Sequence, residues 1–141
     1  KHNNFLRIDM ESSKVTDDTI AIYNKLLENS TNVGPVFQAY LYRTYEDIQN
    51  IANKNLLNFR LCKGIYKESE EIAISEYKKI NENYLKILEY AFENKIYVGI
   101  ATHDKYLIDQ CYCLIEKHNV SLDKFEFQVL YGVPMDEYMD N

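Results

Sequence analysis

The chain has 141 residues, of which 46% are apolar and 27% are charged, and its net charge is −6. This composition excludes disordered, collagen-like and Pro-rich chains and predicts one domain with its own core. An acidic chain without a cluster of Lys or Arg is a poor partner for nucleic acid. No apolar run approaches the roughly 18 residues of a membrane span.

Short apolar runs that are typical of strands alternate with longer segments of helical periodicity. The predicted strands are Phe5–Asp9, Val36–Leu41, Phe59–Lys63, Tyr97–Thr102 and Phe125–Leu130. Between them, apolar residues at helical spacing predict helices over Ile20–Leu27, Ile48–Ala52, Tyr77–Ala91 and Leu107–Ile115. Thr16–Asp18, Thr44 and Asp104 offer candidate N-caps for three of these helices.

This alternation predicts an α/β protein with a parallel sheet and right-handed crossovers. Two architectures fit it: a complete doubly wound domain, or about five consecutive units of a (β/α)8 TIM barrel. The polar residues at the strand ends are Asp9, Gln38, Arg60, Thr102 and Gln128. Burying them in a sheet covered on both faces would be costly, whereas a barrel gathers polar groups at its mouth. We therefore favour the partial barrel.

Five strands are too few to close a barrel of eight. The sequence also starts at Lys1 rather than Met, and strand-like sequence begins within a few residues. We therefore expect residues 1–141 to be a single domain, the central part of a longer barrel without its first and last βα units. We expect such a part to associate with itself, because inward faces such as those bearing Ile8, Phe37 and Ile100 lack opposing strands.

Several motifs are absent from the sequence. The glycine spacing excludes a dinucleotide-binding motif and a P-loop, and the histidines are far apart in sequence, so we expect no metal site. The acidic run Glu68–Glu71 is predicted to be the solvated face of a helix. The cysteines, Cys62, Cys111 and Cys113, are predicted to be small buried residues of a protein in the reducing cytoplasm.

Five segments resemble successive signature blocks of the proline dehydrogenase family, in the order and at the spacing of that family. They are Asp9–Ser12, Gln38–Arg43, Arg60–Tyr66, Ala101–Asp104 and Phe125–Gly132. Any one block alone is weak evidence for the family, but five blocks in the same order are specific to it. The similarity covers essentially the whole chain and is strongest to the short bacterial enzymes with a single activity.

The resemblance implies a distorted TIM barrel that binds FAD and oxidises L-proline to Δ1-pyrroline-5-carboxylate, the first step of proline degradation to glutamate. It implies that Asp9 and Arg60 are catalytic and that Tyr66 and Leu130 lie near the substrate. The positions that match cofactor-binding residues are Met10, Gln38, Lys63, Gly64, Ile65, Thr102, His103 and Gln128. The implied partners are L-proline and a quinone or other electron acceptor. In the parent enzyme this acceptor can be associated with a membrane.

This sequence also departs from the family pattern. The adjacent arginines that hold the substrate carboxylate in the family, and a lysine of an early strand, have no counterpart here. Ile65 and Cys62 stand where the family often has Ala and Val. We therefore expect the chain alone to be catalytically silent and to bind FAD weakly at best.

The chemistry of the side chains agrees with the resemblance. A fixed cation such as Arg60 can stabilise the negative charge of a reduced flavin in a low-dielectric mouth. Gln38 can both donate to and accept from the edge of the flavin ring, and Gly64 lets the backbone approach a cofactor closely.

Simpler interpretations remain open at this point. Arg60 and Asp9 can form a buried ion pair without a catalytic role, and Tyr66 can simply pack against its neighbours. His103 can be a core or cap histidine, and Thr102 can begin a helix cap. Two other functions also remain open: a doubly wound ligand-binding module without catalysis, and a different flavin- or phosphate-binding barrel enzyme.

Overall fold

The computed structural model describes residues 4–51 and 54–132. Its strands are β1 (Leu6–Ile8), β2 (Val33–Gln38), β3 (Asn58–Cys62), β4 (Tyr97–Ala101) and β5 (Phe125–Gln128). Its α-helices are α1 (Thr16–Leu27), α2 (Thr44–Asn50), α3 (Tyr77–Glu93) and α4 (Lys105–Lys117). Short 3-10 turns lie at Ser13–Val15, Lys54–Leu56 and Leu122–Lys124. Ala52, the expected end of the second helix, lies outside the described residues.

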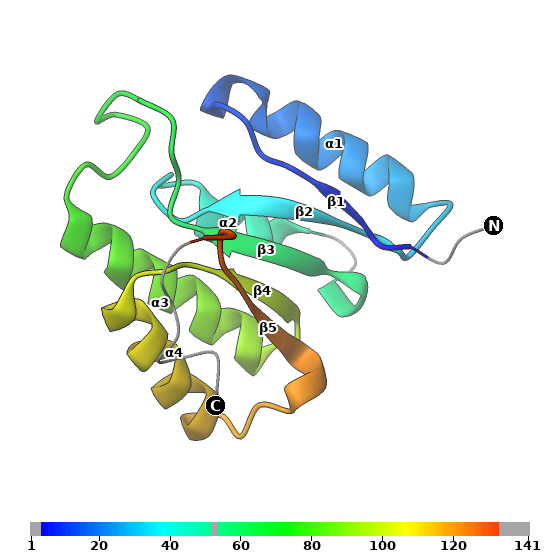
Figure 1. The fold of residues 1–141 in the computed structure, drawn as a ribbon. Coiled ribbons are helices and arrows are strands. Elements are labelled where there is room, and N and C mark those ends of the chain that lie inside the picture. The colour runs from blue at the N-terminus through cyan, green and yellow to red at the C-terminus, as the bar shows by residue number, and fades with distance from the viewer. Residues whose placement is uncertain (1–3, 52–53, 133–141) are drawn as a thin grey trace.

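The strands pair in parallel and in chain order, β1-β2-β3-β4-β5, as Figure 1 shows. Because each crossover leads to the next strand in the same direction, right-handed connections place the helices on one face of the sheet. A doubly wound sheet would instead reverse its strand order at a switch point. The order confirms a run of barrel-type βα units and contradicts the doubly wound alternative.

The face of the sheet under the helices holds the apolar core. Phe37, Leu61 and Ile100 are paired side by side across β2, β3 and β4, and each is at most 1% exposed. They belong to one buried cluster with residues of all the helices, including Leu88 of α3 and Leu107 of α4. Ile8 also packs against this cluster, so the prediction that Ile8, Phe37 and Ile100 face inward is wrong. Side chains alternate along a strand, and because Gln38 faces inward, its neighbour Phe37 must face outward.

Some element ends differ from their predictions. β2 begins at Val33 and ends at Gln38, because the chain then turns away, with the backbone N–H groups of Ala39 and Tyr40 still bonded to Cys62 and Lys63. Asp104 caps α4 as expected, accepting from the backbone of Tyr106 at 3.0 Å.

The other two candidate caps do not act as caps. The Thr44 hydroxyl donates to the carbonyl of Gln38 at 2.6 Å, and Val15 rather than Thr16 precedes the first helical residue of α1. Of the cysteines, Cys111 is fully buried and Cys62 is half-buried, but Cys113 on the outer side of α4 is exposed, contrary to its prediction.

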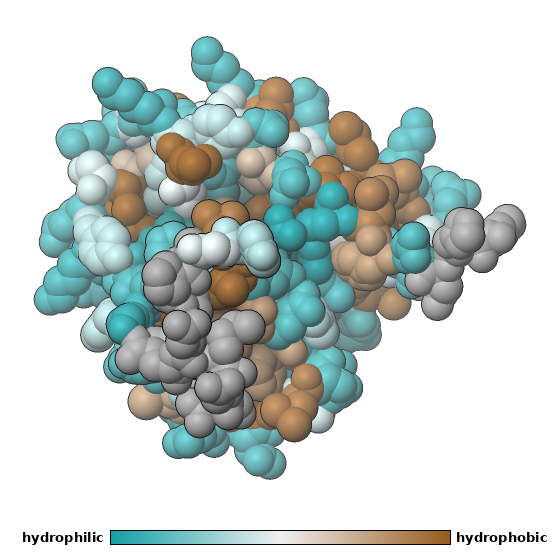
Figure 2. All heavy atoms as spheres, viewed as in Figure 1, coloured by the Kyte–Doolittle hydropathy of each residue, from teal (hydrophilic) through white to brown (hydrophobic). Residues whose placement is uncertain are grey.

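The first strand carries exposed apolar side chains. Leu6 on β1, Phe5 just before it, and Ile22 and Leu26 on α1 are all more than a third exposed. Apolar atoms gather over this part of the surface in Figure 2. Within residues 4–51 and 54–132, none of the helices combines the length and the apolar character that crossing a membrane requires.

Arg7 ties three strands together across the concave face of the sheet. Its guanidinium leaves β1, crosses β2 at Gly34 and donates to the carbonyl and to the side chain of Asn58 on β3, at 2.8 and 2.7 Å. A Cβ at Gly34 would lie 1.9 Å from the Asn58 carbonyl oxygen and 2.6 Å from the guanidinium of Arg7. The glycine is therefore required by this close approach.

Replacing Gly34 with Ala should destabilise the protein by about 3 kcal/mol or more, because a backbone atom cannot move away as a flexible side chain can. Urea unfolding of the full-length protein measures this loss. Replacing Arg7 with Met removes the crossing but leaves Gly34 in place, so it should lower the free energy of unfolding by less. An Ala variant with the wild-type unfolding midpoint would contradict the packing described.

Candidate active site

A cleft of about 940 Å³ lies at the carboxyl ends of the strands. Every site residue that the sequence predicted lines it: Asp9, Met10, Gln38, Arg60, Lys63, Gly64, Ile65, Tyr66, Thr102, His103, Gln128 and Leu130. The size is that of sites for drug-sized ligands and cofactors. The cleft shows that these residues lie together, while their individual roles stay predictions.

Arg60 lies on the floor of the cleft and is held from both sides. Its Nη1 donates to Asp9 Oδ1 at 2.9 Å, and its Nε donates to Gln128 Oε1 at 2.5 Å. Gln128 in turn donates to Glu126 at 2.5 Å. Side-chain exposure is 33% for Arg60 and 71% for Asp9, so the pair is open to the cleft rather than fully buried. With five N–H donors, the guanidinium keeps donors for a ligand while its position is fixed.

Gln38 and Met10 form the buried wall beside Arg60. Both are at least nine-tenths buried, and the side-chain amide of Gln38 donates to the backbone carbonyl of Glu11 at 2.9 Å. In the described part of the chain the side-chain oxygen of Gln38 has no hydrogen-bond donor. This acceptor in the cleft wall is a feature that a polar ligand can satisfy.

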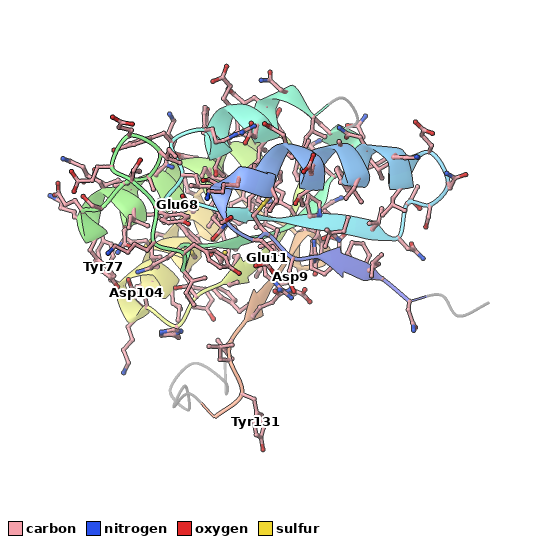
Figure 3. All side chains as sticks on the ribbon, turned by 90° about the horizontal axis from the view of Figure 1, so that it is seen from above. Asp9, Glu11, Glu68, Tyr77, Asp104 and Tyr131 are labelled. Atoms are coloured by element: carbon pink, nitrogen blue, oxygen red, sulfur yellow. The ribbon has the colours of Figure 1, made fainter. Side chains whose placement is uncertain are left out.

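Asp104 connects three elements at the other end of the cleft. Its carboxylate accepts from Lys63 at 2.5 Å, from Tyr77, and from Asn81 at 3.2 Å, and Figure 3 shows it beside Tyr77. The Lys63 ammonium also lies 3.8 Å from the centre of the Tyr77 ring. Desolvation would raise the pKa of Asp104, but the three hydrogen bonds outweigh it and lower the pKa to about 2.

Gly64 follows β3 with φ at +116°, a conformation that other residues rarely adopt. A Cβ there would lie 2.1 Å from the ring of Tyr40, so this close packing, as well as the φ angle, requires a glycine. The next residues stand at the mouth of the cleft: Ile65 is 87% exposed and Tyr66 is 37% exposed. Leu130 is also largely exposed there.

The other two predicted residues follow β4. Thr102 is buried, and its hydroxyl accepts from the backbone N–H of Asp104 at 3.1 Å, which agrees with the simpler cap interpretation. His103 is exposed on the cleft, so it is not a core histidine. Glu11, Tyr77 and Asp104 line the cleft without having been predicted as site residues. Asp104 was recognised as a cap, but sequence separation hides its contact with Lys63.

One group of potential metal ligands lies away from the cleft. Glu89, Glu93 and His118 have ligand atoms within 4.8 Å of one another. The Glu89 carboxylate already lies 2.6 Å from the Lys117 ammonium and 3.1 Å from His118. Surface ion pairing between α3 and α4 therefore explains why these side chains lie close together.

Consecutive βα units with a polar cleft at the carboxyl ends of the strands are typical of the TIM-barrel class of proteins. The family model for proline dehydrogenase matches residues 1–139, and the chain belongs to that family. It is 42% identical over 133 residues to proline dehydrogenase 2 of Bacillus subtilis strain 168, covering 94% of this chain and 44% of the relative. It is 30% identical to proline dehydrogenase of Deinococcus radiodurans, covering 96% of this chain and 44% of that protein.

Solved structures of proline utilization A (PutA) share the fold. The structure from Bdellovibrio bacteriovorus, inactivated by N-propargylglycine, matches 92% of this chain and 16% of its own with a TM-score of 0.81 and 28% identity. A PutA variant from Bradyrhizobium japonicum gives a TM-score of 0.80 at 20% identity, over 95% of this chain and 16% of its own, which shows the fold alone. The chain thus spans less than half the length of the curated relatives named above.

Replacing Asp104 with Asn should lower the free energy of unfolding at neutral pH by about 1–3 kcal/mol, because hydrogen bonds to a charged group are lost while the cap can remain. The depressed pKa means that this stabilisation is fully present above the ordinary value of 3.8 and is lost as the pH falls through about 2. The stability difference between wild type and variant in the full-length protein should therefore shrink between these pH values.

The matched control is Asp18→Asn, an exposed residue in the first turn of α1, which should change stability by less than about 0.5 kcal/mol. A difference between wild type and the Asp104 variant that stays constant down to pH 2 would contradict the assigned ion pair.

Proposed function

We propose that residues 1–141 are the central part of a proline dehydrogenase that oxidises L-proline to Δ1-pyrroline-5-carboxylate with FAD bound in the cleft. The observation that carries the proposal is the fixed Arg60 guanidinium, held by Asp9 and Gln128 on the floor of a cleft that all the expected site residues line. Membership of the family supports the substrate and the reaction.

The residues present fit a flavin nucleotide. The cleft has the volume for a large ligand, and cations stand at both of its ends as Arg60 and Lys63. Its wall offers the side-chain oxygen of Gln38, which has no donor among residues 4–51 and 54–132. Lys63 has three donors, so its contact with Asp104 leaves others for an anionic group. The residues that would hold FAD are Met10, Gln38, Lys63, Gly64, Ile65, Thr102, His103 and Gln128.

The chemistry that FAD supplies when bound is acceptance of a hydride from C5 of the proline ring. The electron pair of the C–H bond leaves with the hydride, the ring nitrogen loses a proton, and a C=N bond forms. Arg60 would stabilise the negative charge that develops on the acceptor, and Asp9 would hold Arg60 in place. Tyr66 and Leu130 would wall the substrate ring at the cleft mouth.

The proposal extends to the surroundings of the reaction. The electrons would pass to a quinone or another acceptor. In the parent enzyme this acceptor can be associated with a membrane. A cytoplasmic location is supported by the free thiols of Cys62, Cys111 and Cys113. Because the substrate arginines of the family are absent from residues 1–141, these residues alone would be inactive, and the exposed apolar residues near β1 favour their self-association.

The proposed function is tested on the full-length protein by assaying dye reduction that depends on L-proline. We expect turnover with L-proline and none with an acyclic amino acid of similar size. A protein that purifies without flavin and reduces no dye would contradict the proposal.

Replacing Arg60 with Met in the full-length protein should lower turnover by about 10²–10³, the scale of losing one fixed electrostatic donor. Methionine keeps much of the side-chain volume, so the fold and the bound flavin should remain, which the flavin spectrum checks. Arg43 is the control, because it pairs with Asp17 and Asp47 outside the cleft. Arg43→Met should leave turnover within about twofold, and wild-type turnover in Arg60→Met would refute the role of Arg60.

A further inference from the structure

The acidic run Glu68–Glu71 does not form a solvated helix face as predicted. It lies in the loop between β3 and α3, and the Glu68 carboxylate reaches back to the loop after β1. One oxygen accepts from the backbone N–H of Ser13 at 2.7 Å, and the other accepts from the Ser13 hydroxyl at 2.8 Å. Both bonds lower the pKa of Glu68, so the carboxylate is ionised at neutral pH.

A second contact joins the same two loops beside the first. The Tyr66 hydroxyl donates to the carboxylate of Glu11, and the backbone carbonyl of Glu11 accepts from Gln38 in the cleft wall. We call the pairs Glu68–Ser13 and Tyr66–Glu11 the clasp. The clasp connects the loop after β3 to the loop after β1 over the intervening end of β2, along one side of the cleft.

Apolar packing does not fix this loop on its own. From Ile65 to Ile72, each side chain except that of Glu68 is exposed, and buried contact resumes only at Ala73, which packs with Tyr40 and Leu41. A segment with so few buried contacts depends on its hydrogen bonds for a defined position. Tyr66, near the start of this segment, lines the cleft.

We infer that Glu68 is a positioning residue that holds Tyr66 at the cleft mouth through Ser13 and thereby sets the affinity of the enzyme for its cyclic amino acid substrate. This inference rests on the proposed function of the cleft. Glu68 touches neither the floor of the cleft nor Arg60, so its loss should act on substrate affinity and leave the chemical step unchanged. Its effect should also appear in the motion of the loop itself.

The experiment replaces Glu68 with Gln in the full-length flavoprotein. The amide of Gln keeps one acceptor for Ser13 but loses the charge and the second acceptor. We expect the KM for L-proline to rise about tenfold, with kcat and flavin content within about twofold of wild type. Backbone amides of residues 64–70 should exchange hydrogen faster in the variant, in protein without substrate.

Two further variants sharpen the result. Ser13→Ala removes the hydroxyl but keeps the backbone N–H, so it should raise KM by a smaller factor, and it serves if Glu68→Gln fails to fold. The matched control is Glu70→Gln, because Glu70 is exposed in the same run and contacts no partner among residues 4–51 and 54–132. It should leave KM and hydrogen exchange as in wild type.

The inference is overturned if Glu68→Gln has the wild-type KM and exchange, if it lowers kcat instead, or if Glu70→Gln shifts KM equally. These failures are distinct from failure of the proposed function, which would appear as a wild-type protein that does not oxidise proline. In that event the exchange measurement still decides whether Glu68 holds the loop.

Discussion

Parallel pairing of five strands in chain order is the constraint on which the rest of this structure depends. Parallel pairing brings the carboxyl ends of all the strands to one edge, and chain order with right-handed crossovers keeps the helices on one face. The apolar residues Phe37, Leu61 and Ile100 must then face the helices, because only that face is covered. The opposite face is left for polar residues, and its upper end is the cleft.

Polar groups on that concave face would be costly if they lacked partners. The structure gives them partners in two layers. In the lower layer Arg7 crosses Gly34 to reach Asn58, and in the upper layer Arg60 is held by Asp9 and Gln128. The lower layer connects strands, whereas the upper layer is open to the cleft. Arginine side chains bound by polar partners thus connect the strands in the lower layer and form part of the candidate site in the upper layer.

The order of elements and the polar residues at the strand ends could be predicted from local patterns in the sequence. Met10, Gly64, Ile65, Tyr66 and Leu130 were implied only by the resemblance to the proline dehydrogenase family. Strand and helix periodicity is local, and polar residues at strand ends converge whenever the strands are parallel. The direction in which Phe37 and Ile100 point was predicted wrongly, because Gln38 and Phe37 are neighbours and only one of them can face inward.

The contacts of Asp104 and Glu68 could not be predicted from the sequence. Lys63 lies 41 residues before Asp104, and Ser13 lies 55 residues before Glu68. No local pattern distinguishes Glu68 from Glu70 two residues further on, although one carboxylate is bound by Ser13 and the other is exposed. Such pairings arise only when loops from different strands meet at the same edge of the sheet.

We propose the cleft at the carboxyl ends of the strands as the flavin site of this proline dehydrogenase family member. A crystal structure of the full-length protein with FAD tests it most directly. We expect the flavin ring to lie in the cleft, in contact with both Arg60 and Gln38. A flavin bound elsewhere, with Arg60 and Gln38 facing only solvent, would contradict it.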